Sequence, residues 1–322
     1  MLKRLRSTAV AAAVASIALV ASGCAGGGGE KGTDILTIAT GGSSGVYYQV
    51  GAGYAKLLKD TLDSDTTVQA TGASVENLTL IEDGNAEIAF TQADAVDQAL
   101  KGEGPFEDNQ IDDIQAIGAL YDQYIQVVTT EKTGIKSFDD LKGKRISVGD
   151  ANSGVELNAR SVVKAYGYTY DDFKVDYLSY SDAIDAMKNG QLDAAFFTSG
   201  IPNSAVSDLA TTEKVVVLPL DGDGAKTLLE EHDYLGEATI PADTYNSAED
   251  IKTLTIPNLL VASPELTEEA GYEITKVFYD NLDKLESSHS SVADIDRDKA
   301  ADVKVTDLHP GAKKYFEEEG LL

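Results

Sequence analysis

The sequence has very little cysteine, histidine or tryptophan, and this limits its chemistry. Cys24 is the only cysteine among 322 residues, so no disulfide can form within one chain. Tryptophan is absent, and the three histidines are His232, His289 and His309. No spacing of His, Cys or carboxylate residues fits a metal site, and neither a P-loop nor a Rossmann glycine triplet occurs. We therefore expect no metal and no cofactor.

Basic residues are also scarce. Lysine and arginine together number 26 against 54 acidic residues, which gives a formal net charge of −28. After the first few residues the only arginines are Arg145, Arg160 and Arg297. So acidic a chain is a poor partner for nucleic acid or for an anionic membrane surface.

Long apolar runs are missing, and the N-terminal one is short. Residues 8–20 form an apolar run of 13 residues after Lys3, Arg4 and Arg6, too short to span a bilayer. We interpret residues 1–23 as a secretory signal peptide and Cys24 as a lipidation site, followed by a flexible tether over 24–33. We expect the protein to be extracytoplasmic and to contact the membrane only through its N-terminal lipid.

The remaining sequence alternates strand and helix patterns, which favours an α/β fold. It begins with a β-branched run over 35–40, then a loop of small residues, then an amphipathic helix from about Val46. Small residues let backbone approach a ligand closely, and the first amides of a helix are free donors at its positive end. We therefore predict that this loop contacts an anionic ligand through Gly42, Ser43, Ser44 and Gly45.

A similar pattern recurs about 110 residues later. Ser153, Gly154 and Val155 follow a strand and enter a helix, as residues 44–46 do. Gly84 and Gly190 each end a helix and are followed three residues later by an acid and then by an Ala-Phe strand. We infer two similar lobes whose loops face each other, although any two α/β units share part of this pattern.

The chain order indicates that the second lobe is inserted into the first. We assign residues 34–126 and 255–322 to lobe 1 and residues 127–254 to lobe 2. The apolar stretch over 115–130 looks too long for one strand, so we expect a crossing strand only at 125–129. Hinge strands near Ile125 and Thr255 would leave a ligand cleft between the lobes.

Polar residues at strand and helix ends are candidates to line that cleft. Gln92, Thr198 and Ser199 follow the two matched strands. Thr71 and Ser74 precede a predicted helix over 75–82, where they can act as caps, as cleft groups, or as both.

For the aromatic and acidic candidates, the sequence does not decide whether the side chain lines the cleft or packs in the core. Tyr47 opens the first predicted helix, where its ring can line the cleft or pack inside. Tyr121 and Tyr124 precede the crossing strand, and we favour Tyr121 as a ligand contact. Asp94 would repel an anion but could receive an amino group.

Eight segments resemble one known family and occur in its order across residues 35–320. They are TGGSSGVYYQVG, TGASVENL, GNAEIAFTQAD, GALYDQY, FDDLKGKRISVGDANSGVE, GQLDAAFFTSGIP, PADTY and HPGAKKYFEEEG. The chain resembles the TAXI class of substrate receptors, which serve tripartite ATP-independent periplasmic (TRAP) transporters.

The resemblance implies a two-lobed fold of the type II periplasmic-binding-protein class. It also implies a small solute, a carboxylate or an amino acid such as glutamate or 2-oxoglutarate, which is delivered to TRAP membrane permease subunits. Many TRAP receptors of the other main class hold the carboxylate with an arginine, whereas Arg145 and Arg160 here are better explained as surface charges. The loop amides would then do most of the binding.

Two other functions compete with the receptor. Residues 41–45 also match the G-x-S-x-G nucleophile pattern, with Ser43 as the serine of a secreted hydrolase, which would need a histidine partner. The second alternative is a surface lipoprotein that has no role in transport. We expect no catalysis and favour the receptor.

Overall fold

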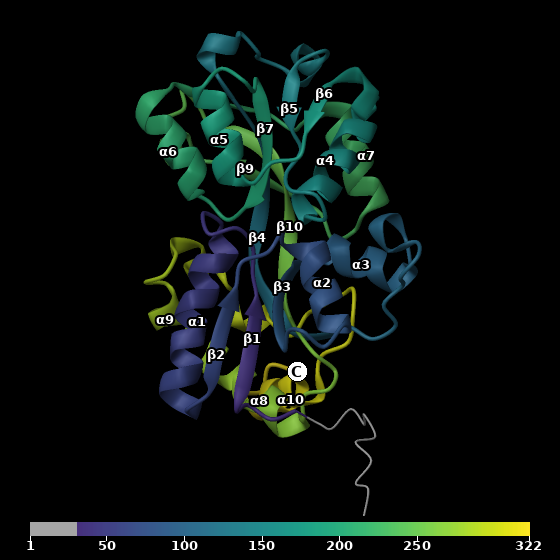
Figure 1. Ribbon diagram of the computed structural model, residues 1–322, viewed down its shortest axis with the longest axis vertical. Coiled ribbons are helices and arrows are strands. Elements are labelled where there is room, and N and C mark those ends of the chain that lie inside the picture. The colour runs from purple at the N-terminus through teal and green to yellow at the C-terminus, as the bar shows by residue number, and fades with distance from the viewer. Residues whose placement is uncertain (1–30) are drawn as a thin grey trace, which may run out of the picture.

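Two long antiparallel strands, β4 (Gln115–Thr130) and β10 (Ile251–Ala262), connect the two halves of the molecule. In the computed structural model, which describes residues 31–322, two lobes are stacked along these strands (Figure 1). Ten strands within the described residues form one sheet in the order β2-β1-β3-β10-β4-β7-β5-β6, with β8 added to β4 and β9 added to β10. A single sheet thus runs through both lobes.

Lobe 1 contains the N-terminal and C-terminal parts of the described chain. Its own strands are parallel to one another, and they are β1 (Ile35–Ala39), β2 (Asp65–Gln69) and β3 (Ile88–Gln92). Its helices are α1 (Val46–Leu62), α2 (Ser74–Glu82), α3 (Ala93–Lys101), α8 (Glu268–Tyr279), α9 (Leu282–Leu285) and α10 (Pro310–Glu318).

Lobe 2 repeats the plan with the middle of the chain. Its strands are β5 (Arg145–Ser147), β6 (Lys174–Asp176), β7 (Ala194–Ser199), β8 (Val215–Leu218) and β9 (Gly236–Ile240). Its helices are α4 (Gly154–Ala165), α5 (Tyr180–Lys188), α6 (Ser204–Thr212) and α7 (Gly222–Glu231).

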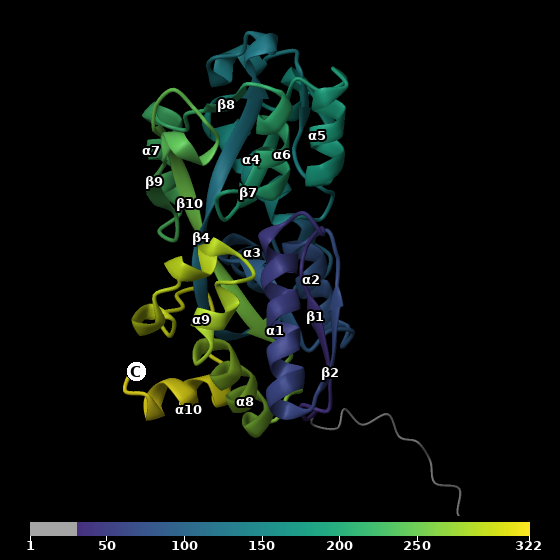
Figure 2. The same ribbon diagram turned by 90° about the vertical axis from the view of Figure 1, so that its left-hand side faces the viewer.

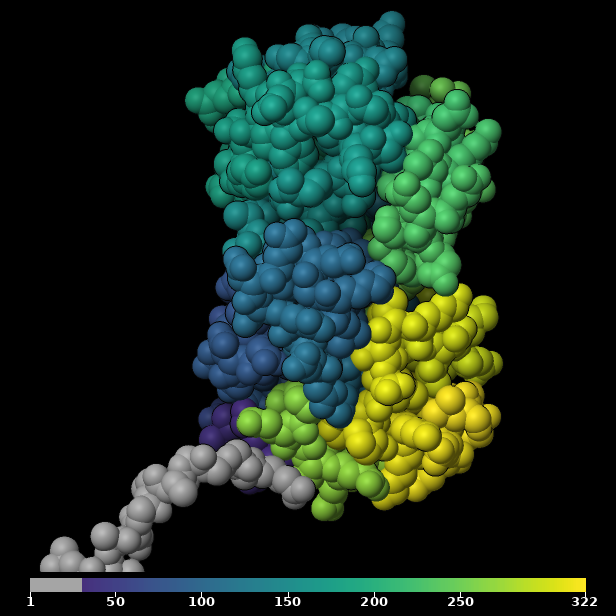
Figure 3. Space-filling model, turned by 90° about the vertical axis from the view of Figure 1, so that its right-hand side faces the viewer, coloured from purple at the N-terminus to yellow at the C-terminus, as the bar shows by residue number. Residues whose placement is uncertain are grey.

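Helices cover both faces of the sheet in each lobe (Figure 2). In lobe 1 the α1 side packs around Tyr54, Phe90 and Phe278, while the α2 and α3 side packs around Leu78 and Phe106. The C-terminal segment, yellow in Figure 3, covers one side of this lobe. Because both faces are covered, the inner strand β3 (IAFTQ) is buried along its whole length, whereas the edge strand β2 (DTTVQ) is polar and partly exposed.

The recurring glycine-acid pattern has the same structural role in both lobes. Glu87 accepts a hydrogen bond from the backbone N–H of Thr37 at 2.8 Å, and its own N–H donates to the Thr37 carbonyl. Asp193 does the same with Arg145, whose N–H lies 2.9 Å from its carboxylate. Glu87 therefore joins the start of β3 to its parallel neighbour β1, and Asp193 joins the start of β7 to its parallel neighbour β5. The repeat inferred from the sequence thus corresponds to the same hydrogen bonds in both lobes.

The α/β prediction is confirmed, but one element was misjudged. Residues 115–130 form one strand of 16 residues, not a shorter crossing strand at 125–129. The strand is long because it pairs with β10 in lobe 1 and with β7 and β8 in lobe 2. The predicted lobe boundaries at 126/127 and 254/255 fall inside β4 and β10, and they stay predictions.

The predicted signal peptide and Cys24 lie outside the described residues, as does most of the tether. The tether was expected to extend to residue 33, yet Lys31 already binds lobe 1. Its backbone N–H donates to Glu265 at 2.8 Å, and its ammonium lies 3.1 Å from Glu87. None of the helices within residues 31–322 is long and apolar enough to cross a membrane.

Candidate functional site

A small cavity lies between the lobes, where the loops that follow β1 and β5 meet. Its space for the centres of water molecules is about 40 Å³, against the 10–15 Å³ or so that one water needs. Its walls come from both lobes and are formed by Gly41, Gly42, Ser44, Gly45, Val46, Tyr47, Gly72, Ala73, Gln92, Gln123, Asp150, Ser153, Gly154, Val155, Tyr180, Thr198 and Ser199.

The N-terminus of α1 forms the wall from lobe 1. Its N-cap residue is Gly45, which has extended backbone (φ −87°, ψ 156°) and supplies no capping side chain. The first amides of this 17-residue helix, from Val46 onward, therefore lack a side-chain partner at the positive end of the helix dipole. An anionic group on a ligand can supply the missing acceptor.

The N-terminus of α4 forms the opposing wall, but it is already capped. Ser153 accepts a hydrogen bond from the Glu156 N–H at 3.1 Å and donates to the Asp150 carbonyl at 2.7 Å. The single O–H donor of Ser153 is therefore already used. The amides of Gly154 and Val155 are the parts of this helix end that remain for a ligand.

Two polar side chains in the wall are buried without a partner. The Thr198 hydroxyl oxygen and Gln92 Oε1 make no hydrogen bond, although each residue is only 2% exposed. Gln92 is held in place because its Nε2 donates to Gln123 Oε1 at 2.7 Å. Buried polar groups normally have partners, so two orphans in one cavity indicate a place for a polar ligand.

Other hydroxyl groups of the wall already have partners. Tyr47 donates to Asn258 at 2.6 Å, and Tyr180 donates to the Thr198 carbonyl at 2.7 Å. Ser199 donates to the Gly200 carbonyl at 2.9 Å. Burial raises the pKa of both tyrosines, so they stay neutral at physiological pH. These side chains shape the cavity and position its neighbours.

The lobes touch each other around the cavity. Ser44 accepts from Ser181 through its hydroxyl at 3.0 Å and from Ser204 through its carbonyl at 2.7 Å. On another side, Asn158 Nδ2 of α4 donates to Asp94 of α3 at 2.7 Å. These contacts join the two lobes at two places.

Ten of the fourteen predicted contact residues line this cavity. They are Gly42, Ser44, Gly45, Tyr47, Gln92, Ser153, Gly154, Val155, Thr198 and Ser199. The structure thus brings both predicted loops and both strand ends together. That these residues bind a solute stays a prediction.

The other four do not line the cavity. Ser43 is exposed at the tip of its loop. Thr71 donates to Asn77 at 2.6 Å and accepts from the Ala73 N–H, so it organises the start of α2. Ser74 accepts from the Gln92 N–H at 3.2 Å, and Tyr121 is buried in the core of lobe 1. Thr71 and Ser74 thus organise the backbone of lobe 1, although the Ser74 hydroxyl also lies close to Gly154 of lobe 2.

Asp94, which the sequence left open as a possible partner for an amino group, lies outside the cavity wall. It is 4% exposed and bonded to Asn158, and burial raises its pKa to about 7. The carboxylate that does line the cavity is Asp150, which sequence reasoning missed. Asp150 lies in the loop before α4, three residues from the predicted Ser153, and this proximity was the available signal.

Six further wall residues were also missed. Gly41, Val46, Gly72 and Ala73 adjoin predicted residues, so a wider window around each loop would have included them. Gln123 and Tyr180 carried no such signal. Gln123 reaches the cavity only because β4 runs beside β10, and Tyr180 because α5 packs over β7.

The hydrolase alternative has no support from the arrangement of its residues. Among the hydrogen bonds of residues 31–322, none joins Ser43 to a histidine. His309 is 1% exposed and accepts from the Gly311 N–H, and His289 accepts from the Ser291 N–H. His232 stacks on Tyr234. Each histidine is occupied elsewhere.

No basic residue lines the cavity wall. Arg145 is paired with Asp193 at 2.6 Å, and Arg160 with Glu156 one helical turn away at 2.5 Å. Within the described part of the chain, no group of three or more His, Cys, Asp or Glu residues could hold a metal ion.

Solved structures share this architecture. A structure described as a periplasmic transporter matches with a TM-score of 0.56 and 13% identity, over 89% of this chain and 94% of its own. PhnD1 from Prochlorococcus marinus, in complex with methylphosphonate, matches with a TM-score of 0.55 and 13% identity, over 90% and 100%. A protein from Bordetella bronchiseptica matches with a TM-score of 0.53 and 16% identity, over 90% and 99%.

At such identities the likeness shows the fold alone, and it confirms the predicted two-lobed α/β architecture of periplasmic binding proteins. The sequence itself carries a more specific match. The NMT1-like family matches residues 38–320, which include the cavity, both lobes and the C-terminal helix. The protein is therefore a member of the NMT1-like family.

Proposed function

We propose that the protein is an extracytoplasmic solute receptor that binds a small carboxylate or amino acid between its lobes, without catalysing a reaction. The observation that carries the proposal is the cavity itself. It combines two unpartnered buried polar groups, on Gln92 and Thr198, with the uncapped N-terminus of α1. A polar solute supplies partners that the protein lacks.

Closure of the lobes is how such a receptor encloses its solute. The cavity wall takes residues from both lobes, so a solute bound there contacts both lobes and favours the arrangement in which they lie together. The connections that must deform are β4 and β10, near the predicted hinge residues Ile125 and Thr255. Domain closure about a few residues at such connections is a common response to ligands.

The transporter is the finer part of the proposal. The eight segments that resemble TAXI receptors support delivery of the solute to TRAP permease subunits. The structures that share the fold include one described as a periplasmic transporter, which agrees with a transport role. Lipid attachment at Cys24 would keep the receptor at the membrane that holds the permease.

A thermal-shift screen of amino acids, monocarboxylates and dicarboxylates tests the receptor function. We expect one chemical group of solutes to raise the melting temperature by several degrees, since a ligand at 100 times its Kd adds about 2.7 kcal/mol of stability. Absence of any shift at millimolar concentration would instead favour the surface lipoprotein. Ester turnover that is lost in Ser43→Ala would revive the hydrolase.

A further inference from the structure

The only charged residue in the cavity wall is Asp150. Of the 17 residues that form the wall, the others are neutral, and no lysine, arginine or histidine is among them. A solute with two negative charges would therefore meet backbone amides at the two helix termini but no cationic side chain. A desolvated charge without a partner is strongly unfavourable.

The Asp150 carboxylate lacks a countercharge within the described chain. It is half-buried, and no basic side chain pairs with it. Burial raises its pKa, and the nearby carboxylates of Asp182 and Glu76 raise it further. Those two have partners of their own, because Ser179 donates to Asp182 and the Gly72 N–H donates to Glu76. A positively charged ligand group beside Asp150 would therefore supply the countercharge that this carboxylate lacks.

The orphan acceptor on Gln92 points to the same kind of ligand group. Gln92 Oε1 needs a donor, since the Nε2 of this amide is already bonded to Gln123. An ammonium group has three N–H donors and can serve several acceptors at once. The uncapped α1 terminus has the opposite need, because its free amides require an acceptor.

We propose that Asp150 determines specificity, so that the cavity selects small solutes with both an ammonium and a carboxylate group over carboxylates without an amine. This rests on the proposed receptor function. The carboxylate of the solute lies at the N-terminus of α1, and the ammonium group faces Asp150. Asp150 repels solutes that carry two carboxylates and no amine, so the cavity discriminates against them as well as attracting the ammonium group.

Matched solute pairs, measured by isothermal titration calorimetry on the purified protein, test the proposal. The pairs are L-alanine with propionate, L-aspartate with succinate, and L-glutamate with glutarate, whose members differ only in the amino group. For the pair that fits the cavity, we expect the amino acid to bind at least about 10-fold more tightly than its partner.

The variant Asp150→Asn keeps the size of the side chain and removes its charge. We expect it to bind the amino acid at least about 10-fold more weakly and to bring the ratio within the pair close to one. Asp182→Asn is the matched control, because it removes an acid near Asp150 that does not line the cavity. It should keep the preference. Circular dichroism and melting temperature establish that both variants are folded.

The possible outcomes separate this inference from the function on which it rests. Equal or tighter binding of the partner without an amine to the unmodified protein overturns the role of Asp150 and leaves the receptor function standing. A preference for the amino acid that survives in Asp150→Asn also overturns the role of Asp150 and leaves the receptor function standing. If no member of any pair binds, both the receptor function and this inference are wrong.

Discussion

Gly154 shows how a single residue can control closure of the lobes. A Cβ atom at this position would lie 2.4 Å from Gln92 Oε1 and 2.8 Å from the Ser74 hydroxyl, both of which belong to lobe 1. Glycine is needed here because of this close approach and not because of a special backbone conformation. Gly32, which precedes β1 and does not line the cavity, has nothing within 4 Å of such a Cβ.

The variant Gly154→Ala should therefore reduce solute affinity by about 10-fold or more, because its methyl group displaces Gln92 and prevents full closure. The fold of each lobe should remain, since alanine is a better helix residue than glycine. Titration calorimetry measures the loss, and Gly32→Ala is the control that should bind nearly as well as the unmodified protein. Equal affinity of both variants would contradict a role for Gly154 in closure.

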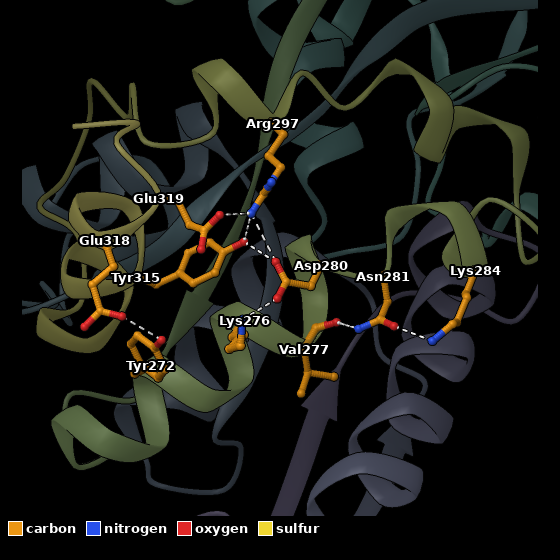
Figure 4. A network of polar contacts seen from close by, with 10 residues as sticks. All are labelled: Tyr272, Lys276, Val277, Asp280, Asn281, Lys284, Arg297, Tyr315, Glu318 and Glu319. Carbon is orange, nitrogen blue, oxygen red and sulfur yellow. Dashed lines mark hydrogen bonds and ion pairs between the residues drawn. The ribbon is translucent and has the colours of Figure 1, made fainter.

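At the scale of elements, the C-terminal segment is attached to lobe 1 by a polar network (Figure 4). The Arg297 guanidinium lies 3.1 Å from Asp280, 2.5 Å from the Tyr315 hydroxyl and 2.9 Å from Glu319. Asp280 directly follows α8, whereas Tyr315 lies in α10. The Arg297 side chain thus connects its own segment to the end of α8 and to the C-terminal helix α10.

Arg297→Ala should lower the free energy of unfolding by about 1–2 kcal/mol, because several charge-assisted hydrogen bonds are lost at a partly exposed site. Urea denaturation measures this change. Lys284→Ala is the control, since Lys284 makes one exposed hydrogen bond, to Asn281 at 2.6 Å, and its loss should change stability by less than about 0.5 kcal/mol. Similar values for both variants would show that the network adds nothing beyond single surface contacts.

At the scale of the whole molecule, one hydrogen bond between the lobes involves a buried carboxyl group that titrates. Asp94 in lobe 1 accepts a hydrogen bond from Asn158 in lobe 2, and burial raises the pKa of Asp94 from 3.8 to about 7. Asp97, on the same helix, raises it further. Because the folded protein holds this proton more tightly than the unfolded chain, the group contributes stability that is complete below about pH 4. This contribution is lost as the pH rises through about 7.

The melting temperature of the unmodified protein should thus fall relative to that of Asp94→Asn between pH 4 and pH 8. Asparagine accepts the same hydrogen bond and does not titrate, so it is the matched reference. One pKa unit corresponds to about 1.4 kcal/mol, which predicts a difference of several degrees across this range. Calorimetry at intervals of one pH unit measures it. Parallel pH profiles of the two proteins would show that Asp94 does not titrate in this range.

Local patterns were sufficient for much of the architecture and for part of the site. The alternation of strands and helices predicts the α/β class because each element has its own periodicity and end signals. The Gly-Ser loops before α1 and α4, the polar residues at the ends of β3 and β7, and Tyr47 at the start of α1 together predicted ten residues of the cavity wall. These positions follow from a general rule, since the carboxyl ends of parallel strands meet at one edge of a sheet.

Tertiary structure decided what no local pattern contains. It made residues 115–130 a single strand, because β4 is paired in both lobes. It also turned Thr71 and Ser74 toward backbone groups of their own lobe, and it placed Asp94 behind the cavity and Asp150 in its wall. The sequence by itself determined which elements form and which of their ends carry polar residues. Which carboxylate faces the cavity depended on how two lobes close, and contacts between residues distant in sequence decide that.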